Sequence, residues 1–569
     1  MSLTMNKKEV LLMVAVPIAI FFLFFSLFSL AYLAGDGRMF ADDVFYHTAH
    51  SRAYYEGTAF SYPVYTTFAS HPVDMYYGYH LVTAGFLSGV DVNDTEAVLW
   101  RVRIMNSVLA GIFFSVLYFI AFGLARVTLD ASRLRAVVCG IGTVFILSAL
   151  VNSFDSRLLL IRPHLLSSLF MLLSFYFSLR RRYVLIFLLG VITPLFYSMS
   201  VLVFIPPVFF ALSDVFVRRF KIKDLAFLYP LASILFGWVV GILFHPDILN
   251  YLYNALFVNS LAIISVLVSH VTIEGAESSP HVMQIIDLPW FLGFLVAMLF
   301  YLVRYHLTRS FDKTVSSSEL FLLMLTVFFF PLLMLIERGV EYFFPFWSLL
   351  VVIVIYRIYS YWTDSGGLFL TDSQPPPSGG SFWIEARKIG QVVYENKKRI
   401  TVVLVSMTMV FFIATWLGIA MYMESKVDPS DQYKRAADFI YADSKGIGIV
   451  FTQSFSDFPR LVFFNPHNQY IMGFANMYTY QYSKDLYKLY FSIVKGEEVC
   501  QKTCASGDTS RGIYDSLKND FHASYVFLNT MNGSNSASTS PFFKILEQDS
   551  RFERVFVDDV YPSVMVYKL

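Results

Sequence analysis

The stretch VLLMVAVPIAIFFLFFSLFSLAYLA (residues 10–34) is an unbroken apolar run, and ADDVFYH (residues 41–47) follows it closely. A helix rises about 1.5 Å per residue and the hydrocarbon core of a bilayer is about 30 Å thick, so the run predicts a membrane-spanning helix. Asp42 and Asp43 then lie just outside the hydrocarbon, on the side opposite Lys7 and Lys8. Ionisable groups at this depth are costly to hold, so we expect them to bind or react with something.

The composition is that of a polytopic α-helical membrane protein. The 569 residues are 56% hydrophobic and only 15% charged, whereas soluble domains are roughly one quarter charged. A formal net charge of +1 gives no reason to expect nucleic acid as a partner. The first apolar run is longer than a signal-peptide core and lacks a small-x-small cleavage site, so we interpret it as a retained anchor.

Similar apolar runs recur along the chain and set the predicted topology. We expect spans near residues 10–34, 104–125, 136–153, 164–179, 183–198, 200–217, 225–245, 289–306, 319–336, 343–360 and 400–422. Lys and Arg gather in alternate loops, which the positive-inside rule assigns to the cytoplasm: 126–135, 180–182, 218–223, 304–313 and 397–399. The predicted protein is a multi-pass protein of the cell membrane, with its N-terminus in the cytoplasm.

Two segments could change this count. Residues 183–217 are too long for one ordinary span and carry Arg-rich flanks at both ends, so two short helices joined near Tyr197–Ser200 are predicted. Residues 251–269 are apolar enough to cross, but a crossing would invert every later loop. We therefore expect this segment to lie along the outer interface.

The chain is predicted to comprise a membrane domain (residues 1–423) and an extracytoplasmic α/β domain (residues 424–569). The membrane domain has a long first outer loop (35–103) and a Pro-rich cytoplasmic linker (361–399). In the second domain we expect helices near 431–443 and 483–495 and strands at 447–452, 524–528 and 563–568. Cys500 and Cys504 could form a disulfide in an outer compartment, or remain free thiols.

The first outer loop is richest in reactive side chains. Asp43, His47, His50 and Tyr54 share one face of a helix that begins at the acid pair. Such an Asp could accept a proton from a substrate hydroxyl or hold a divalent cation, and His47 could orient it or join the cation. The structural alternative is that an Asp simply caps the helix. Farther on, the loop adds more acid, imidazole and aromatic groups at His71–Asp74 and Tyr76–His80.

Several arginines lie on the outer side, against the charge rule. Candidate substrate-binding residues are therefore Arg157, Arg162, His164, Arg338, Glu341 and Tyr342 beside the outer ends of the spans, with His47, His71, Asp74 and Glu277 from the outer loops. Guanidinium groups bind phosphate oxygens through paired donors. The alternatives are salt bridges to Asp155 or Glu337, or snorkelling to lipid headgroups.

The pattern resembles the GT-C class of membrane glycosyltransferases. Asp43–His47 and the following Arg52–Gly57 resemble the first-loop motif of oligosaccharyltransferase catalytic subunits, and Asp155 falls where that family has its second acidic motif. Thr272–Pro280 is similar to its external-loop motif with a Glu. The family's Trp-Trp-Asp-Tyr-Gly motif is absent from residues 424–569, which contain no tryptophan. Transfer of a single sugar to a hydroxyl therefore fits better than glycosylation of asparagine.

The resemblance implies a reaction and its participants. A polyprenyl-phosphate sugar would be the donor, a lipid, glycan or protein the acceptor, and the transfer would invert the sugar on the outer face of the membrane. Asp42 or Asp43 would be the catalytic base or the acid that binds the acceptor, and the arginines would stabilise the departing phosphate. Some relatives use a divalent cation, Mg or Mn, and others do not; Asp43, Asp155 and His47 would be its ligands.

Three other classes of protein fit the sequence less well. A lipid or polyisoprenoid transporter should have polar groups near the middle of its spans and an internal repeat, whereas here the acids cluster in outer loops. Another type of lipid-phosphate enzyme would use the same acids and arginines. A receptor anchored by its helices explains neither the many spans nor the acids at the interface.

The charge distribution makes the topology testable. In a chain whose native cysteines are replaced by serine, a cysteine introduced at Ser536 should react with an impermeant thiol reagent added from outside. One introduced at Ser378, in the predicted cytoplasmic linker, should react only after the membrane is permeabilised. The reverse labelling would overturn the topology and every loop assignment that depends on it.

Overall fold

We analysed a computed structural model of the chain. The structure describes residues 7–35, 42–58, 65–217, 225–258, 288–308, 316–335, 338–364, 397–426, 429–473, 476–497, 509–530 and 540–569. The predictions for Thr272–Pro280 with Glu277, for Cys500 and Cys504, and for most of the linker 361–399 lie outside these ranges.

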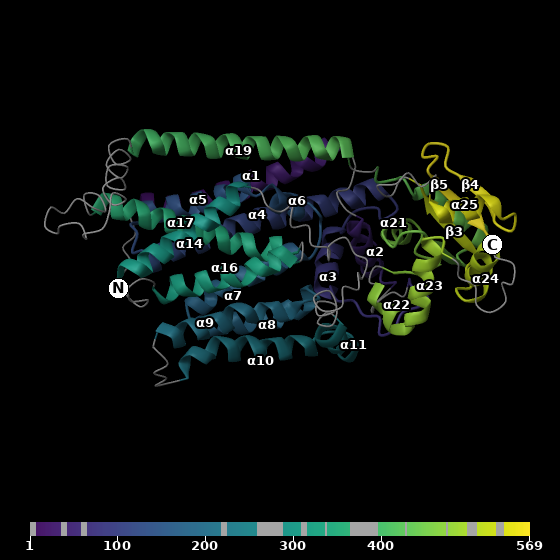
Figure 1. Cartoon of the computed structure of the whole chain (residues 1–569), viewed down its shortest axis with the longest axis horizontal. Coiled ribbons are helices and arrows are strands. Elements are labelled where there is room, and N and C mark those ends of the chain that lie inside the picture. Colours follow the sequence, from purple (N-terminus) through teal and green to yellow (C-terminus); the bar gives the residue numbers. More distant parts are fainter. Residues whose placement is uncertain are drawn as a thin grey trace.

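The molecule is an elongated helical bundle with a small sheet at one end (Figure 1). Each predicted span coincides with a helix: α1 (Lys7–Ala34), α4 (Thr95–Thr128), α5 (Arg133–Leu150), α7 (His164–Leu179), α8 (Tyr183–Phe196), η1 with α9 (Ser200–Phe204 and Ile205–Val217), η2 with α10 (Ala226–Leu228 and Tyr229–Leu243), α14 (Leu288–Thr308), α16 (Ser317–Leu335), α17 (Gly339–Asp364) and α19 (Lys397–Lys426). Within the described residues, 7 helices are long and apolar enough to cross a membrane, and four more are apolar but shorter. The chain is a multi-pass membrane protein.

The two segments that could change the number of predicted spans, residues 183–217 and 251–269, differ in what the structure describes. α8 ends at Phe196, Tyr197 is extended, and η1 begins at Ser200, which confirms the predicted break between two short helices. The second segment begins with α11 (Ile248–Tyr253) and a π turn (Asn254–Val258), and its continuation lies outside the described residues.

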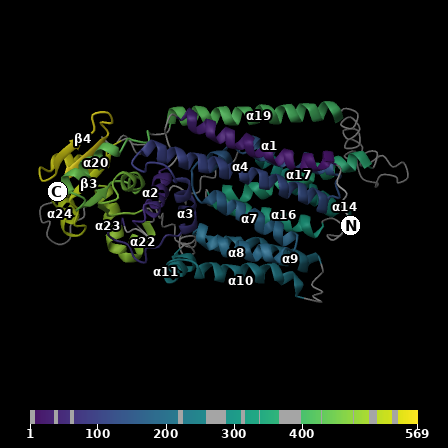
Figure 2. The same ribbon diagram turned by 180° about the vertical axis from the view of Figure 1, so that it is seen from behind.

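The short helix α8 packs closely against α10. Gly190 on α8 and Gly237 and Gly241 on α10 lie where a Cβ would overlap the backbone of the other helix, including the carbonyl oxygen of Phe187. Small residues allow this approach, which in a membrane supplies the dispersion contacts that hold helices together. Figure 2 shows α8 and α10 side by side, and α1 beside α19 at the opposite edge of the bundle.

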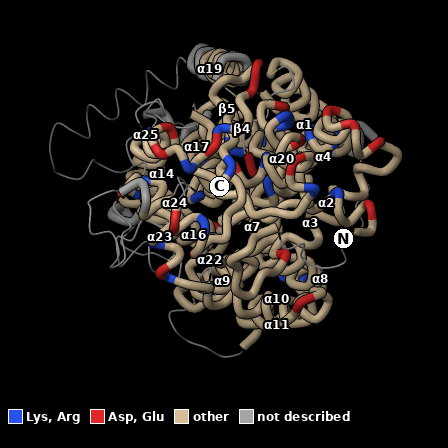
Figure 3. The backbone as a smooth tube through the Cα atoms, turned by 90° about the vertical axis from the view of Figure 1, so that its right-hand side faces the viewer, with Lys and Arg blue, Asp and Glu red and all other residues tan. Residues whose placement is uncertain are grey.

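The strands form a five-stranded mixed sheet with order β2-β1-β3-β5-β4. β1 (Ile449–Thr452) pairs in parallel with β2 (Gln469–Tyr470) and β3 (Tyr525–Asn529), and β5 (Val564–Lys568) pairs antiparallel with β3 and β4 (Glu553–Val557). The connecting helices are α20 (Lys434–Ser444), α21 (Asp457–Phe464), α22 (Asn476–Tyr482), α23 (Lys484–Val494), α24 (Thr509–Asn519) and α25 (Pro541–Gln548). Viewed from this end, positive and negative residues are interspersed (Figure 3).

The segment between α1 and α4, the predicted first outer loop, joins the bundle to the sheet. Its helices α2 (Asp43–Tyr55) and α3 (Tyr77–Phe86) lie between the bundle and the strands (Figure 1). Thr66 forms a parallel bridge with Tyr470, where the amide of Tyr470 donates to the carbonyl of Tyr65 at 2.8 Å. This segment therefore extends the sheet beyond its β2 edge.

The glycine contact between α8 and α10 predicts a specific packing defect. Gly237→Ala places a methyl group against the backbone of α8, and overpacking of this kind destabilises by about 1–3 kcal/mol. Gly142→Ala on α5 is the matched control, because nothing lies within 4 Å of the added Cβ. Thermal unfolding in detergent should show a lower Tm for Gly237→Ala only; an unchanged Tm would mean that this helix pair is not closely packed.

Candidate active site

A polar pocket lies where the helical bundle meets α2. Its lining residues come from α2, the segment before α3, α6 (Asn152–Leu158), the turn into α7, the end of α8 and the start of α17: Asp43, His47, Tyr76, Arg157, Arg162, Pro163, His164, Tyr197, Arg338 and Glu341. Residues from opposite ends of the sequence therefore converge on one place. Seven of them were predicted as site residues from the sequence.

Asp43 and Arg162 form an ion pair across the pocket. The Nε atom of Arg162 lies 2.5 Å from Oδ2 of Asp43, and both side chains are less than one fifth exposed. Burial raises the pKa of the Asp43 carboxyl, against the opposing charge of Arg162. The partner of Arg162 is thus Asp43, and not Asp155 as one structural alternative had it.

A second, fully buried ion pair joins α6 to α17. The Nε of Arg157 donates to Oε1 of Glu341 at 2.8 Å, and the backbone carbonyl of Arg157 lies 2.9 Å from Nε2 of His164. Breaking one partner of such a pair costs about 3–5 kcal/mol, because the other charge is left buried without compensation. The pair therefore fixes the positions of the pocket walls.

The third guanidinium, Arg338, keeps its charge in this surrounding. Burial opposes the charge, but Tyr197, Tyr76 and Glu341 around it raise the pKa of Arg338 overall. α7 and α17 both begin at the pocket, at His164 and Gly339, so their N-terminal dipole ends also favour an anion there.

The pocket has an excess of positive charge. Three guanidinium groups and two carboxylates line it. One positive charge remains when both carboxylates are ionised and the imidazoles are neutral, and burial lowers the pKa of His47 well below its usual value. The arrangement suits an anionic group with several oxygen acceptors.

The acid pair is split between two functions. Asp42 occupies the N-cap position of α2 but its side chain makes no capping hydrogen bond. Instead it accepts a hydrogen bond from Nε of Arg460 on α21 at 2.6 Å, across 418 positions of sequence. Asp42 therefore connects α2 to the C-terminal part of the chain, and Asp43 is the acid that faces the pocket.

The remaining predicted residues lie around or away from the pocket. The Tyr342 hydroxyl donates to that of Tyr197 at 2.9 Å, one layer behind the wall. His71 lies at the surface, with Nδ1 2.9 Å from Oδ1 of Asn250. Asp155 is buried elsewhere and accepts from the Ser148 hydroxyl at 2.5 Å.

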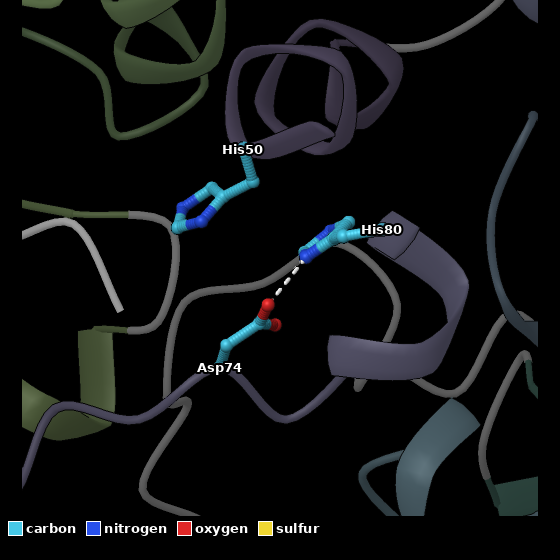
Figure 4. Close-up of side chains that lie close together, drawn as sticks. All are labelled: His50, Asp74 and His80. Carbon is cyan, nitrogen blue, oxygen red and sulfur yellow. Dashed lines mark hydrogen bonds and ion pairs between the residues drawn. The ribbon is translucent and has the colours of Figure 1, made fainter. Parts of the chain in front are cut away.

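The predicted cation ligands Asp43, Asp155 and His47 do not form one cluster in the described part of the chain. Asp155 faces α5 through Ser148, whereas Asp43 and His47 face the pocket. The one cluster of that kind among the described residues is His50, Asp74 and His80, whose ligand atoms all lie within 4.8 Å of one another (Figure 4).

Hydrogen bonds already occupy this cluster. His80 Nδ1 lies 2.7 Å from Oδ2 of Asp74, and His80 Nε2 lies 2.8 Å from Nδ1 of His47. A metal ion could bind His80 only by displacing one of these partners. The cluster is therefore a hydrogen-bonded network that leads from Asp74 to the pocket.

Three lining residues, Tyr76, Pro163 and Tyr197, and the contact from Arg460 were not predicted from the sequence as parts of the site. Tyr197 lines the pocket from the break between α8 and η1, and that break was the available signal. Arg460 reaches Asp42 from the C-terminal part, and its position in the sequence carries no comparable signal.

Comparison with known proteins shows the fold. No family model and no curated protein matches the sequence. Among solved structures, the archaeal oligosaccharyltransferase AglB from Archaeoglobus fulgidus, in complex with an inhibitory peptide and a dolichol-phosphate, superposes with a TM-score of 0.55 at 10% identity. The match covers 88% of this chain and 69% of that one. ArnT from Cupriavidus metallidurans in the apo state gives a TM-score of 0.51 at 13% identity over 98% of this chain and 97% of that one.

These similarities agree with the predicted fold class. AglB and ArnT are GT-C glycosyltransferases, and the present chain has the same architecture of a polytopic helical bundle with a C-terminal α/β part. A further AglB structure, in complex with Zn and sulfate, matches with a TM-score of 0.52 at 10% identity over 95% of this chain and 73% of that one.

Proposed function

We propose that the protein is a membrane glycosyltransferase that takes a sugar from a polyprenyl-phosphate donor at the pocket beside α2. The observation that carries the proposal is the convergence of Arg157, Arg162 and Arg338 on one pocket that also contains Asp43. A departing phosphate needs positive charge, and a hydroxyl acceptor needs a carboxylate or imidazole beside it. The GT-C fold supports this choice over a transporter or a receptor.

In this proposal the arginines have unequal parts. Arg157 is committed to Glu341, so its main part is to hold the wall of the pocket. Arg162 and Arg338 would contact the donor phosphate, and the N-terminal ends of α7 and α17 would add to the attraction. The polyprenyl chain would lie between helices of the bundle, in contact with membrane lipids.

Asp43 would bind the acceptor hydroxyl opposite the departing phosphate. The oxygen of the acceptor attacks C1 of the sugar, the bond from C1 to the phosphate oxygen breaks, and the phosphate keeps the electron pair. Asp43 would orient the acceptor by accepting a hydrogen bond from it. Asp42 has no contact with this step in the proposal.

The proposal needs no divalent cation at the phosphate. Arg162 and Arg338 supply the positive charge that Mg or Mn would otherwise supply. A cation at His50, Asp74 and His80 would have two imidazole ligands, which favour a transition metal over Mg.

The acceptor is proposed to be a lipid, glycan or protein hydroxyl, on the extracytoplasmic side of the membrane. One AglB structure carries an acceptor peptide containing the NVT sequon. The present chain lacks tryptophan in residues 424–569, so the tryptophan-containing motif of that family cannot be formed there.

The binding part of the proposal is tested with decaprenyl phosphate and the full chain in nanodiscs. Arg162→Gln and Arg338→Gln should each weaken binding, because a hydrogen bond to a charged group contributes about 1.5–3 kcal/mol.

Transfer is tested by mass spectrometry, with a panel of decaprenyl-phosphate hexoses and pentoses and with octyl glucoside as the hydroxyl acceptor. Asp43→Asn should fold, bind decaprenyl phosphate and fail to consume the donor, with a loss of about 10²–10⁴-fold in rate.

Asp42→Asn is the matched comparison, since it makes the same change one residue away and outside the pocket. It should retain donor consumption, because the amide oxygen of the introduced asparagine can still accept the hydrogen bond from Arg460. Equal activity in Asp43→Asn and the unmodified chain, or unchanged decaprenyl phosphate binding in both arginine variants, would place the reaction elsewhere.

A further inference from the structure

A chain of hydrogen bonds leads away from the pocket into a buried carboxylate. His47 lines the pocket, its Nδ1 lies 2.8 Å from Nε2 of His80, and Nδ1 of His80 lies 2.7 Å from Oδ2 of Asp74. All three side chains are buried, and the exposed fractions of His80 and Asp74 are 0% and 1%. The connection joins α2 to the segment before α3 and to α3 itself.

The far end of this chain is held ionised. Asp74 Oδ1 accepts from the backbone amide of Tyr76 at 2.9 Å, and Oδ2 also accepts from the Tyr54 hydroxyl at 2.9 Å. Burial alone would raise the pKa of Asp74, but its interaction with His80 and the hydrogen bond from the Tyr76 amide outweigh burial and lower the pKa. A carboxylate with these donors accepts hydrogen bonds and gives none.

The ionised carboxylate fixes the tautomers of both rings. Asp74 accepts, so Nδ1 of His80 carries a proton, and Nε2 of a neutral His80 is then an acceptor. The hydrogen between the rings must come from Nδ1 of His47. Nε2 of His47 is then the acceptor nitrogen of a ring that faces the pocket.

We infer that His47 receives the proton of the acceptor hydroxyl and passes it to His80, with His80 and Asp74 as positioning residues. The inference rests on the proposed glycosyl transfer. As the acceptor oxygen bonds to C1 and the phosphate departs with its electron pair, the hydroxyl proton moves to Nε2 of His47. The Nδ1 proton of His47 moves to Nε2 of His80. One proton is lost by the acceptor and one is gained by His80, whose positive charge lies against Asp74.

The surroundings keep both rings neutral before the reaction. Burial, together with the neighbouring imidazoles, lowers the pKa of His47 and lowers that of His50 to about 3, so in the resting state each ring is neutral and His47 keeps only the proton on Nδ1. The groups that face His47 and His80 are Tyr46, His50, Tyr54, Asp74, Tyr76, Tyr79, Arg162 and His164. Asp74 is the carboxylate of this set, and it lies beside His80.

The arrangement also separates two tasks at the pocket. Asp43 is tied to Arg162 and so helps to keep the phosphate-binding guanidinium in place. His47 offers a path by which the proton leaves the pocket and does not recombine with the departing phosphate.

Nitrogen-15 NMR of the histidine-labelled full chain in nanodiscs tests the tautomers without any substrate. We expect His47 and His80 both to be neutral near pH 7 and protonated at Nδ1, with assignments made from His47→Gln and His80→Gln. If His47 instead carries its proton on Nε2, the usual tautomer, the hydrogen bonds between the rings run in the opposite direction and the inference is overturned. Binding of Zn²⁺ to His80, seen as loss of the NMR signal of the hydrogen bond between His47 and His80 after Zn²⁺ is added to the purified protein, would also contradict the inference.

Kinetics on the decaprenyl-phosphate panel test the proton path. His47→Gln and His80→Gln should each lower the rate by about 10²–10⁴-fold. The double variant should be no slower than His47→Gln, because residues that act as a unit are not additive. Asp74→Asn removes the negative charge beside His80 but keeps an acceptor, so its rate should fall and the acidic limb of its pH–rate profile should move to lower pH. His467→Gln is the matched control, at an exposed imidazole that does not line the pocket.

The two proposals fail in different ways. Full activity in His47→Gln alongside loss in Asp43→Asn would overturn the proton path and leave the glycosyl transfer intact. Additive losses in the double variant, or a pH profile of Asp74→Asn parallel to that of the unmodified chain, would reduce His80 and Asp74 to structural residues. Unchanged decaprenyl phosphate binding in the arginine variants would remove the proposed transfer itself, while the NMR result would still decide the tautomers.

Discussion

The buried ion pair between Arg157 and Glu341 is the contact on which the pocket depends. It joins α6 to the start of α17, and both side chains are almost completely shielded from water. Charges in such a place are tolerated only when they are paired and hydrogen-bonded, so this pair fixes the relative positions of two helices at the end of an otherwise apolar bundle. With Arg157 neutralised in this way, Arg162 and Arg338 define where an anion can bind.

The C-terminal part closes the same end of the bundle. Asp42 accepts from Arg460, and Thr66 extends the sheet at Tyr470, so the first outer loop is held from two directions. Because α2 begins directly after Asp42, these ties also set the position of Asp43 and His47. The pocket is therefore lined by elements from three distant parts of the sequence.

The architecture could be predicted from the sequence more fully than the contacts between distant residues could. Apolar runs and the Arg-rich flanks located the helices, including the break at Tyr197–Ser200, because both signals are local. The helical face that carries Asp43 and His47 followed from spacing alone. β2, with two residues, and β4, with the polar start Glu553–Arg554, are too short or too polar to stand out.

Long-range pairing could not be predicted from the sequence. Asp155 was a plausible partner for Arg162, but Arg162 pairs with Asp43, which is more than one hundred positions away and becomes a neighbour only when the bundle forms. The predicted cation ligands do not converge in the described part of the chain for the same reason, since Asp155 turns to Ser148 and the ring of His47 bonds to that of His80. Which acid of the pair faces the pocket also depended on Arg460, at the far end of the chain.

The central claim is that the pocket beside α2 binds the phosphate of a polyprenyl-phosphate lipid. A cryo-electron microscopy structure of the full chain in nanodiscs with decaprenyl phosphate tests it most directly. We expect phosphate density within hydrogen-bonding distance of Arg162 and Arg338, with the lipid chain leaving between helices of the bundle. Phosphate density at another site, with the Arg162–Asp43 pair undisturbed and the pocket without lipid, would contradict the account.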